Sequence, residues 1–104
     1  MNLKGPIYCF EYFYAKPGCK ALLLDGLSRL LAPSRNESGC LQYDLLQDQQ
    51  NENLIILIVK FSNPETLAAH EKQPYVCQFS NNELKKYCEQ FTWNSAQEIT
   101  LPLA

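Results

Sequence analysis

The chain has 104 residues, of which 46% are hydrophobic and 19% charged, and its formal charge is −2. These values predict one globular domain over residues 1–104 and exclude an intrinsically disordered chain. The scattered basic residues argue against a nucleic-acid surface, and no apolar run reaches the roughly 20 residues of a membrane-spanning helix.

Residues 7–15 predict the first strand, because their side chains alternate between two faces. One face carries only aromatic side chains, those of Tyr8, Phe10, Tyr12 and Tyr14. The other face carries Ile7, Cys9, Glu11, Phe13 and Ala15. An all-aromatic face is typical of a core beneath a helix or of the wall of an apolar pocket, and the sequence leaves both open.

The next segment changes to helical periodicity after a turn at residues 16–18. From Cys19 onward, one stripe is apolar and consists of Leu23, Leu27, Leu30 and Leu31. Pro33 is expected to disrupt the last turns of this helix, and Gly39 lies where the helix should have ended.

Two strands are expected next, over residues 40–48 and 54–61. The first has Leu41, Tyr43 and Leu45 on one face. The second reads LIILIVKF, a nearly continuous apolar run that predicts burial on both faces. Helices can cover only one of these faces in a domain of this size, so we expect a second copy of the chain to cover the other.

A second helical region begins at residues 63–65, where Asn63 can cap and Pro64 suits the first helical position. This helix should carry His70 and stop before Pro74. A further helical piece is expected at about residues 75–88, with an interruption at residues 80–82. Residues 89–95 look irregular, and the alternation of Ile99, Leu101 and Leu103 predicts a final strand.

The five cysteines are Cys9, Cys19, Cys40, Cys77 and Cys88. Their number is odd and they form no C-x-x-C pair, so neither a disulfide framework nor a Cys/His zinc site is expected. Residues 1–8 lack the apolar stretch of a secretory signal. We therefore expect a cytoplasmic protein whose cysteines are mostly small core residues.

The predicted order is β-α-β-β-α-β, an α+β, ferredoxin-like arrangement with a four-stranded antiparallel sheet and both helices on one face. Three segments carry a family resemblance: Ala15–Gly18, Ala32–Asp44 and Pro64–His70, with Pro74 following. In these segments the chain resembles the antibiotic biosynthesis monooxygenase (ABM) domains. The resemblance implies a dimeric α+β barrel, in which two sheets pack face to face and each protomer holds a pocket between its sheet and helices.

For function, the resemblance implies oxidation of a quinol or polycyclic phenol by O2, with no metal, flavin or haem. Other members of the superfamily isomerise or degrade small signalling molecules. This chain has Val59-Lys60-Phe61 where relatives often have Glu-x-Trp, and Tyr75 where a histidine is common. These departures keep two alternatives open: an enzyme acting on a small metabolite, and a non-catalytic dimeric ligand-binding module.

The candidate catalytic residue is His70, which matches the family's helix-borne histidine and could accept a phenolic proton. The alternative is that His70 only bridges structural groups near the end of its helix. The candidate substrate-binding residues are Tyr43, Tyr12, Phe61, Tyr75 and Arg35. The aromatic members could instead be core. Arg35 and Glu37 could pair with each other, pair with a partner chain or hold the loop at the helix–strand junction.

Overall fold

The computed structural model describes residues 2–100, and the side chains of residues 5–99. The strands are β1 (Asn2–Ala15), β2 (Cys40–Gln47), β3 (Leu54–Phe61) and β4 (Cys88–Thr100). The helices are α1 (Lys20–Ser28), α2 (Leu31–Arg35), α3 (Pro64–Glu71), α4 (Pro74–Asn81) and α5 (Glu83–Tyr87). None of these described helices is long and apolar enough to cross a membrane.

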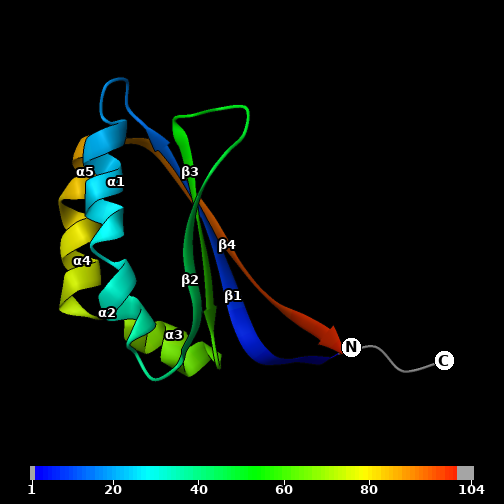
Figure 1. Cartoon of the computed structure of the whole chain (residues 1–104). Helices are drawn as coiled ribbons and strands as arrows, with labels where there is room; N and C mark the ends of the chain where they lie inside the picture. Colours follow the sequence, from blue (N-terminus) through cyan, green and yellow to red (C-terminus); the bar gives the residue numbers. More distant parts are fainter. Residues whose placement is uncertain (1, 101–104) are drawn as a thin grey trace.

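The four strands form one antiparallel sheet in the order β2-β3-β1-β4, and the helices all lie on one side of it (Figure 1). This arrangement confirms the predicted ferredoxin-like fold. One detail differs: the single helix predicted from Cys19 onward is divided into α1 and α2. The ring of Pro33 would clash with the carbonyl of Arg29 in a continuous helix, and the chain accordingly breaks after Ser28. The expected interruption near residues 80–82 is confirmed at Asn82, between α4 and α5.

The prediction that residues 89–95 are irregular is wrong. They belong to β4, which pairs with β1 from Ala15↔Cys88 to Asn2↔Thr100. The polar side chains of β4 hid this strand, because an edge strand is stabilised here by its ladder with β1 more than by apolar alternation. Of the expected final alternation, Ile99 lies in β4, whereas Leu101 and Leu103 lie outside the described residues.

The two faces of β1 are used differently from the prediction. Cys9, Phe13 and Ala15 are buried under the helices, together with Leu23 and Leu27 of α1. The aromatic face therefore lies on the side of the sheet away from the helices, where its side chains are only half-buried: Tyr8, Phe10, Tyr12 and Tyr14. The prediction that a helix covers the aromatic face is therefore wrong, because alternation separates two faces but does not say which one a helix covers.

The same division runs through β3, whose bounds match the prediction. The helix-facing side chains of Ile55, Leu57, Val59 and Phe61 are at most 2% exposed. The alternate side chains lie on the side of the sheet away from the helices, which we call the open face. They are half-buried there: Leu54, Ile56, Ile58 and Lys60. The second apolar face predicted from the LIILIVKF run is therefore present, and within one chain it is uncovered.

Helix α3 is positioned by its N-terminus and by a close contact with Gly39. Asn63 and Thr66 form a capping box, in which the Thr66 amide donates to Asn63 Oδ1 at 2.8 Å, as the predicted cap requires. Gly39 is buried against this cap, and a Cβ on it would lie 2.5 Å from the Cβ of Thr66. The glycine thus lets the α2–β2 junction pass directly over the start of α3.

Replacing Gly39 by alanine is expected to lower the free energy of unfolding by about 1–3 kcal/mol, because the new methyl group overpacks a rigid contact. The neighbouring Cβ of Thr66 belongs to a hydrogen-bonded cap and cannot move without breaking it. Urea denaturation measures the change. Ser38→Ala, at an exposed site next to it, serves as the control. Equal midpoints for Gly39→Ala and the native protein would contradict the contact.

Candidate active site

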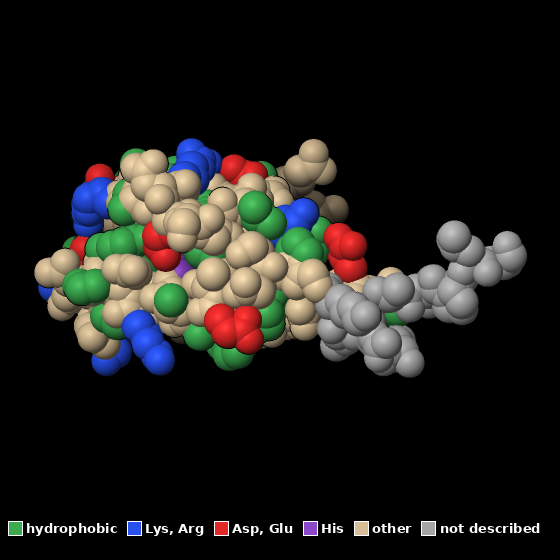
Figure 2. All heavy atoms as spheres, turned by 90° about the horizontal axis from the view of Figure 1, so that it is seen from below, with side chains coloured by type: hydrophobic (Ala, Val, Ile, Leu, Met, Phe, Trp, Pro, Cys, Tyr) green, Lys and Arg blue, Asp and Glu red, His purple; other side chains and the backbone are tan. Residues whose placement is uncertain are grey.

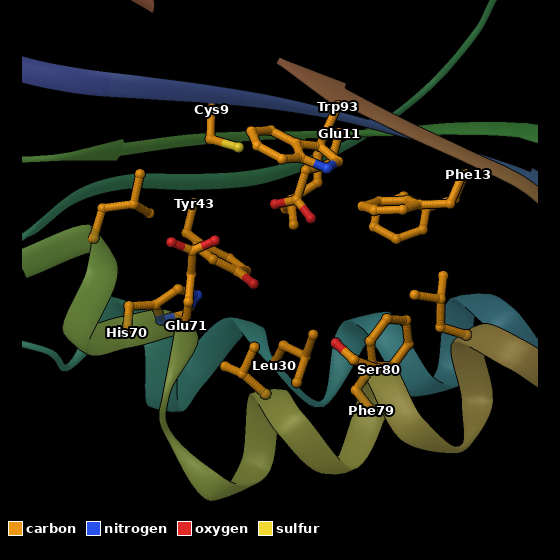
Figure 3. A pocket seen from close by; sticks show the side chains of 15 residues that line it. Cys9, Glu11, Phe13, Leu30, Tyr43, His70, Glu71, Phe79, Ser80 and Trp93 are labelled. Carbon is orange, nitrogen blue, oxygen red and sulfur yellow. The ribbon is translucent and has the colours of Figure 1, made fainter. Parts of the chain in front are cut away.

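A cavity of about 230 Å³ lies between the helix-facing side of the sheet and helices α3, α4 and α5, with Leu30 contributed by the link between α1 and α2 (Figure 3). Five of its wall side chains are aromatic: Phe13, Tyr43, Phe79, Phe91 and Trp93. The apolar remainder is Leu30, Leu57, Leu67, Val76 and Leu84, and the polar groups are Cys9, Glu11, His70, Glu71 and Ser80. An engineered cavity of about 150 Å³ holds benzene, and pockets for drug-sized ligands begin near 300 Å³. The volume therefore suits a molecule of one or two rings.

His70 lies in the cavity wall near the C-terminal end of α3. Its Nδ1 is 2.7 Å from Oε2 of Glu37, and the side chain is 4% exposed, so little of the imidazole is visible in the space-filling view (Figure 2). The ring packs against Phe61 and Tyr43, with centroid distances of 4.9 and 5.4 Å. A carboxylate at Nδ1 favours the tautomer that leaves Nε2 free to accept a proton.

Glu37 has a second donor, because the hydroxyl of Tyr75 also hydrogen-bonds to its Oε2. Burial, followed by this contact with the carboxylate, raises the pKa of Tyr75 to about 12, so Tyr75 stays a neutral donor at physiological pH. The sequence left Glu37 to pair with Arg35, to pair with a partner chain or to hold the junction. The structure instead joins it to both His70 and Tyr75, an arrangement that orients the imidazole at the cavity wall.

Tyr43 projects into the cavity from β2 and is almost completely buried (Figure 3). The pKa of its phenol is raised above the ordinary value, mainly by burial and to a smaller extent by the negative charge of Glu11. Cys9 is affected in the same way. Burial and the charges of Glu11 and Glu71 raise its pKa to about 12, which keeps it a thiol rather than a nucleophilic thiolate at neutral pH.

Glu11 is the functional candidate that the sequence reasoning missed. It lies on the helix-facing side of β1, and its carboxyl group points into the cavity (Figure 3). Burial, and then repulsion from Glu71, raise its pKa to about 7. The sequence does contain one indication of this role. Glu11 is the one charged residue on a strand face that it shares with Ile7, Cys9 and Phe13.

Glu11→Gln is expected to stabilise the protein at pH values above about 7, by about 3 kcal/mol. The folded state holds the Glu11 proton up to a pKa of about 7, against 4.5 for the ordinary side chain. Below pH 4.5 both states are protonated and no penalty exists; the penalty grows between these two values and is complete above the folded pKa. Urea unfolding at acidic and alkaline pH measures it. If the native protein instead became more stable relative to Glu11→Gln as the pH rises, the prediction would be contradicted.

The remaining predicted site residues lie outside the cavity wall. Phe61 packs against the imidazole of His70 and restricts its orientation. Tyr75 contacts His70 indirectly, through its hydrogen bond to Glu37. The guanidinium of Arg35 is exposed; it pairs with Asp44 at 3.0 Å and donates from Nε to the carbonyl of Tyr43 at 3.0 Å. Arg35 thus holds the α2–β2 junction.

Tyr12, which was predicted to bind substrate, lies on the opposite side of the sheet from the cavity. It shares the open face of the sheet with the other even-numbered aromatic residues of β1, whereas the cavity lies on the helix side. Its neighbour Glu11 has the place in the cavity that Tyr12 was expected to take, because successive side chains of a strand point to opposite faces.

Solved structures with the same fold cover nearly the whole chain. Protein PA3566 from Pseudomonas aeruginosa is 27% identical, with a TM-score of 0.86, over 96% of this chain and 100% of its own. Protein SO0527 from Shewanella oneidensis has a TM-score of 0.90 at 19% identity, over 93% of this chain and 95% of its own. No protein among those with curated descriptions matches the chain.

The sequence pattern of the antibiotic biosynthesis monooxygenases matches residues 6–82, well over half of the chain. The chain belongs to the antibiotic biosynthesis monooxygenase family. This membership confirms the resemblance drawn from the sequence and supports a monooxygenase at the level of the family. A solved structure named antibiotic biosynthesis monooxygenase is also similar, with a TM-score of 0.78 at 19% identity, over 92% of this chain and 99% of its own. The matched residues include Glu11, Glu37, Tyr43 and His70, but not Trp93.

Within residues 5–99, no group of three His, Cys, Asp or Glu side chains is placed to hold a metal ion.

Proposed function

We propose that this protein is a cofactor-independent monooxygenase that oxidises a phenol of one or two rings, such as a hydroquinone, with O2. The observation that carries the proposal is the imidazole of His70, oriented by Glu37 at the wall of an aromatic cavity. Its free nitrogen is the group best placed to take a phenolic proton. Membership of the monooxygenase family supports the reaction class.

The chemistry follows from the electronic properties of a phenolate. His70 removes the proton, and the electron-rich phenolate transfers one electron to O2. The resulting radical pair combines to form a carbon–oxygen bond, and the hydroperoxide loses water. In the overall reaction, one molecule of hydroquinone and one molecule of O2 give one molecule of hydroxyquinone and one molecule of water. One oxygen atom enters the ring, and the other leaves as water with the two hydrogens lost from the substrate. A bound aromatic ring displaces water from the cavity, which strengthens the interaction between the base and the phenol.

The test measures oxygen uptake by chelator-treated protein with a panel of one- and two-ring hydroquinones. We expect uptake above the rate of spontaneous autoxidation and, with labelled O2, one labelled oxygen atom in the product. Substrate conversion without oxygen uptake would instead support an isomerase. Binding without any conversion would support a non-catalytic ligand-binding module, and either result would overturn the monooxygenase.

We also propose that the protein is a homodimer, formed through the open face of the sheet. This face carries half-buried apolar side chains from β1 and β3, among them Tyr12, Tyr14, Ile56 and Ile58. A contiguous apolar sheet face of this kind marks an interface. Light scattering at micromolar concentration is expected to give about twice the chain mass of 11.9 kDa. A mass equal to that of one chain would overturn this proposal.

A further inference from the structure

The carboxyl group of Glu11 differs from that of Glu37, because no partner within the described residues satisfies it. Glu37 accepts from His70 and from Tyr75, whereas neither oxygen of Glu11 has a hydrogen bond to the part of the chain that the structure describes. Glu11 is half-buried, and a carboxyl group that loses part of its water without gaining a donor carries a cost in free energy. A ligand that fills the cavity and presents a hydrogen-bond donor to Glu11 removes that cost.

The charge of the cavity wall points to the same kind of ligand. Its titratable groups are Cys9 and Glu11 from β1, Tyr43 from β2, and His70 and Glu71 from α3. Among the described residues, α4 and α5 contribute no charged side chain to the wall, and no Lys or Arg lines it. An aromatic anion would therefore meet negative charge with no fixed cation to balance it.

We propose that Glu11 makes this cavity selective for small aromatic molecules that present a phenolic hydroxyl or an amine, and that it excludes aromatic carboxylates. The inference deepens the proposed function, since it names the substrate class of the same cavity, and it rests on that function for the phenol as the reacting ligand. Glu11 is a specificity-determining residue in this assignment, and proton transfer remains with His70.

The proposal predicts a pH dependence with a definite sign. The pKa of Glu11 is raised to about 7, so its carboxyl group is neutral in mildly acidic solution and can itself donate to a ligand carboxylate. Above that pKa, it is charged and repels the same ligand. Binding of an aromatic carboxylate should therefore weaken as the pH rises through neutrality, whereas binding of a phenol should not.

The test uses the fluorescence of Trp93, which is the one tryptophan in the chain and lines the cavity. Phenol and benzoate are matched in size and are titrated at about pH 5.5 and about pH 8.5, where benzoate is ionised throughout. We expect phenol to bind at least tenfold more tightly than benzoate at the higher pH. Benzoate affinity should fall about tenfold between the two pH values.

In Glu11→Gln, benzoate should gain about tenfold at the higher pH and lose its pH dependence, with thermal unfolding confirming that the variant folds. Glu65→Gln, on the exposed side of α3, should behave like the native protein. Equal binding of the two probes by native protein at the higher pH overturns the proposal. The same pH dependence in Glu11→Gln, or no response to either probe, overturns it as well.

These binding measurements separate the two proposals. A protein that shows this selectivity but consumes no oxygen retains the role of Glu11 and loses the proposed reaction. A protein that oxidises hydroquinones without discriminating between phenol and benzoate retains the reaction and loses the role of Glu11.

Discussion

Replacing His70 by glutamine is expected to slow oxygen uptake by about 10²–10⁴-fold, the usual contribution of a positioned acid–base group. The glutamine amide can still donate to Glu37, so the buried carboxylate keeps a partner, but it cannot accept a proton. The phenol therefore enters the cavity without being ionised. Initial rates over a range of hydroquinone concentrations measure the loss, which should fall on kcat and leave KM largely unchanged.

Two controls separate catalysis from folding. Ligand binding, followed by the fluorescence of Trp93, should persist in His70→Gln, because the aromatic wall is unchanged. Glu37→Gln should reduce kcat by a smaller factor, since it loosens the orientation of the imidazole without removing it. Uptake by His70→Gln at the native rate would remove His70 from the mechanism while leaving the activity in place.

Replacing Ile56 by aspartate is expected to convert the proposed dimer to a monomer at micromolar concentration. Ile56 lies on the open face at the centre of the sheet, paired with Tyr12 of β1 and Leu46 of β2. In a symmetric interface the substitution occurs twice, and each uncompensated buried charge costs several kcal/mol. The measurement is the mass by light scattering, with sedimentation velocity as a second method.

The matched control is Leu22→Asp, which introduces the same charge on the exposed side of α1, where Leu22 is 51% exposed. It should leave the mass unchanged. The monomeric Ile56→Asp variant should also unfold at a lower temperature than the native protein, because association no longer stabilises its folded state. An unchanged dimer in Ile56→Asp would show that the open face is not the interface.

The order of strands and helices followed from local properties of the chain. Asn63 and Pro64 mark the start of α3 because capping acts within a few residues, and the LIILIVKF run marks β3 because its length and side chains suit a buried strand. The same local reasoning failed for residues 89–95. Their ladder with β1 joins segments that lie about eighty residues apart, and no local pattern encodes that pairing.

The candidate site was predictable only in part. His70 and Tyr43 were proposed from the sequence, and both line the cavity. Glu11 was missed because its chemistry comes from its surroundings: the helix layer buries it, and Glu71 lies near enough to oppose its ionisation. For Glu37 the sequence offered only pairing with Arg35, pairing with a partner chain or a role at the junction, because its hydrogen bond to His70 spans 33 positions in the sequence.

By itself, the sequence determined the element order, the fold class and the family, because periodicity, caps and motif spacing are local properties. Tertiary structure alone decided which face of β1 meets the helices. That choice placed Glu11 in the cavity and Tyr12 on the open face. The physical reason is packing: alternation defines two faces of a strand, but only the layer that covers one of them decides which side chains lose water and change their chemistry.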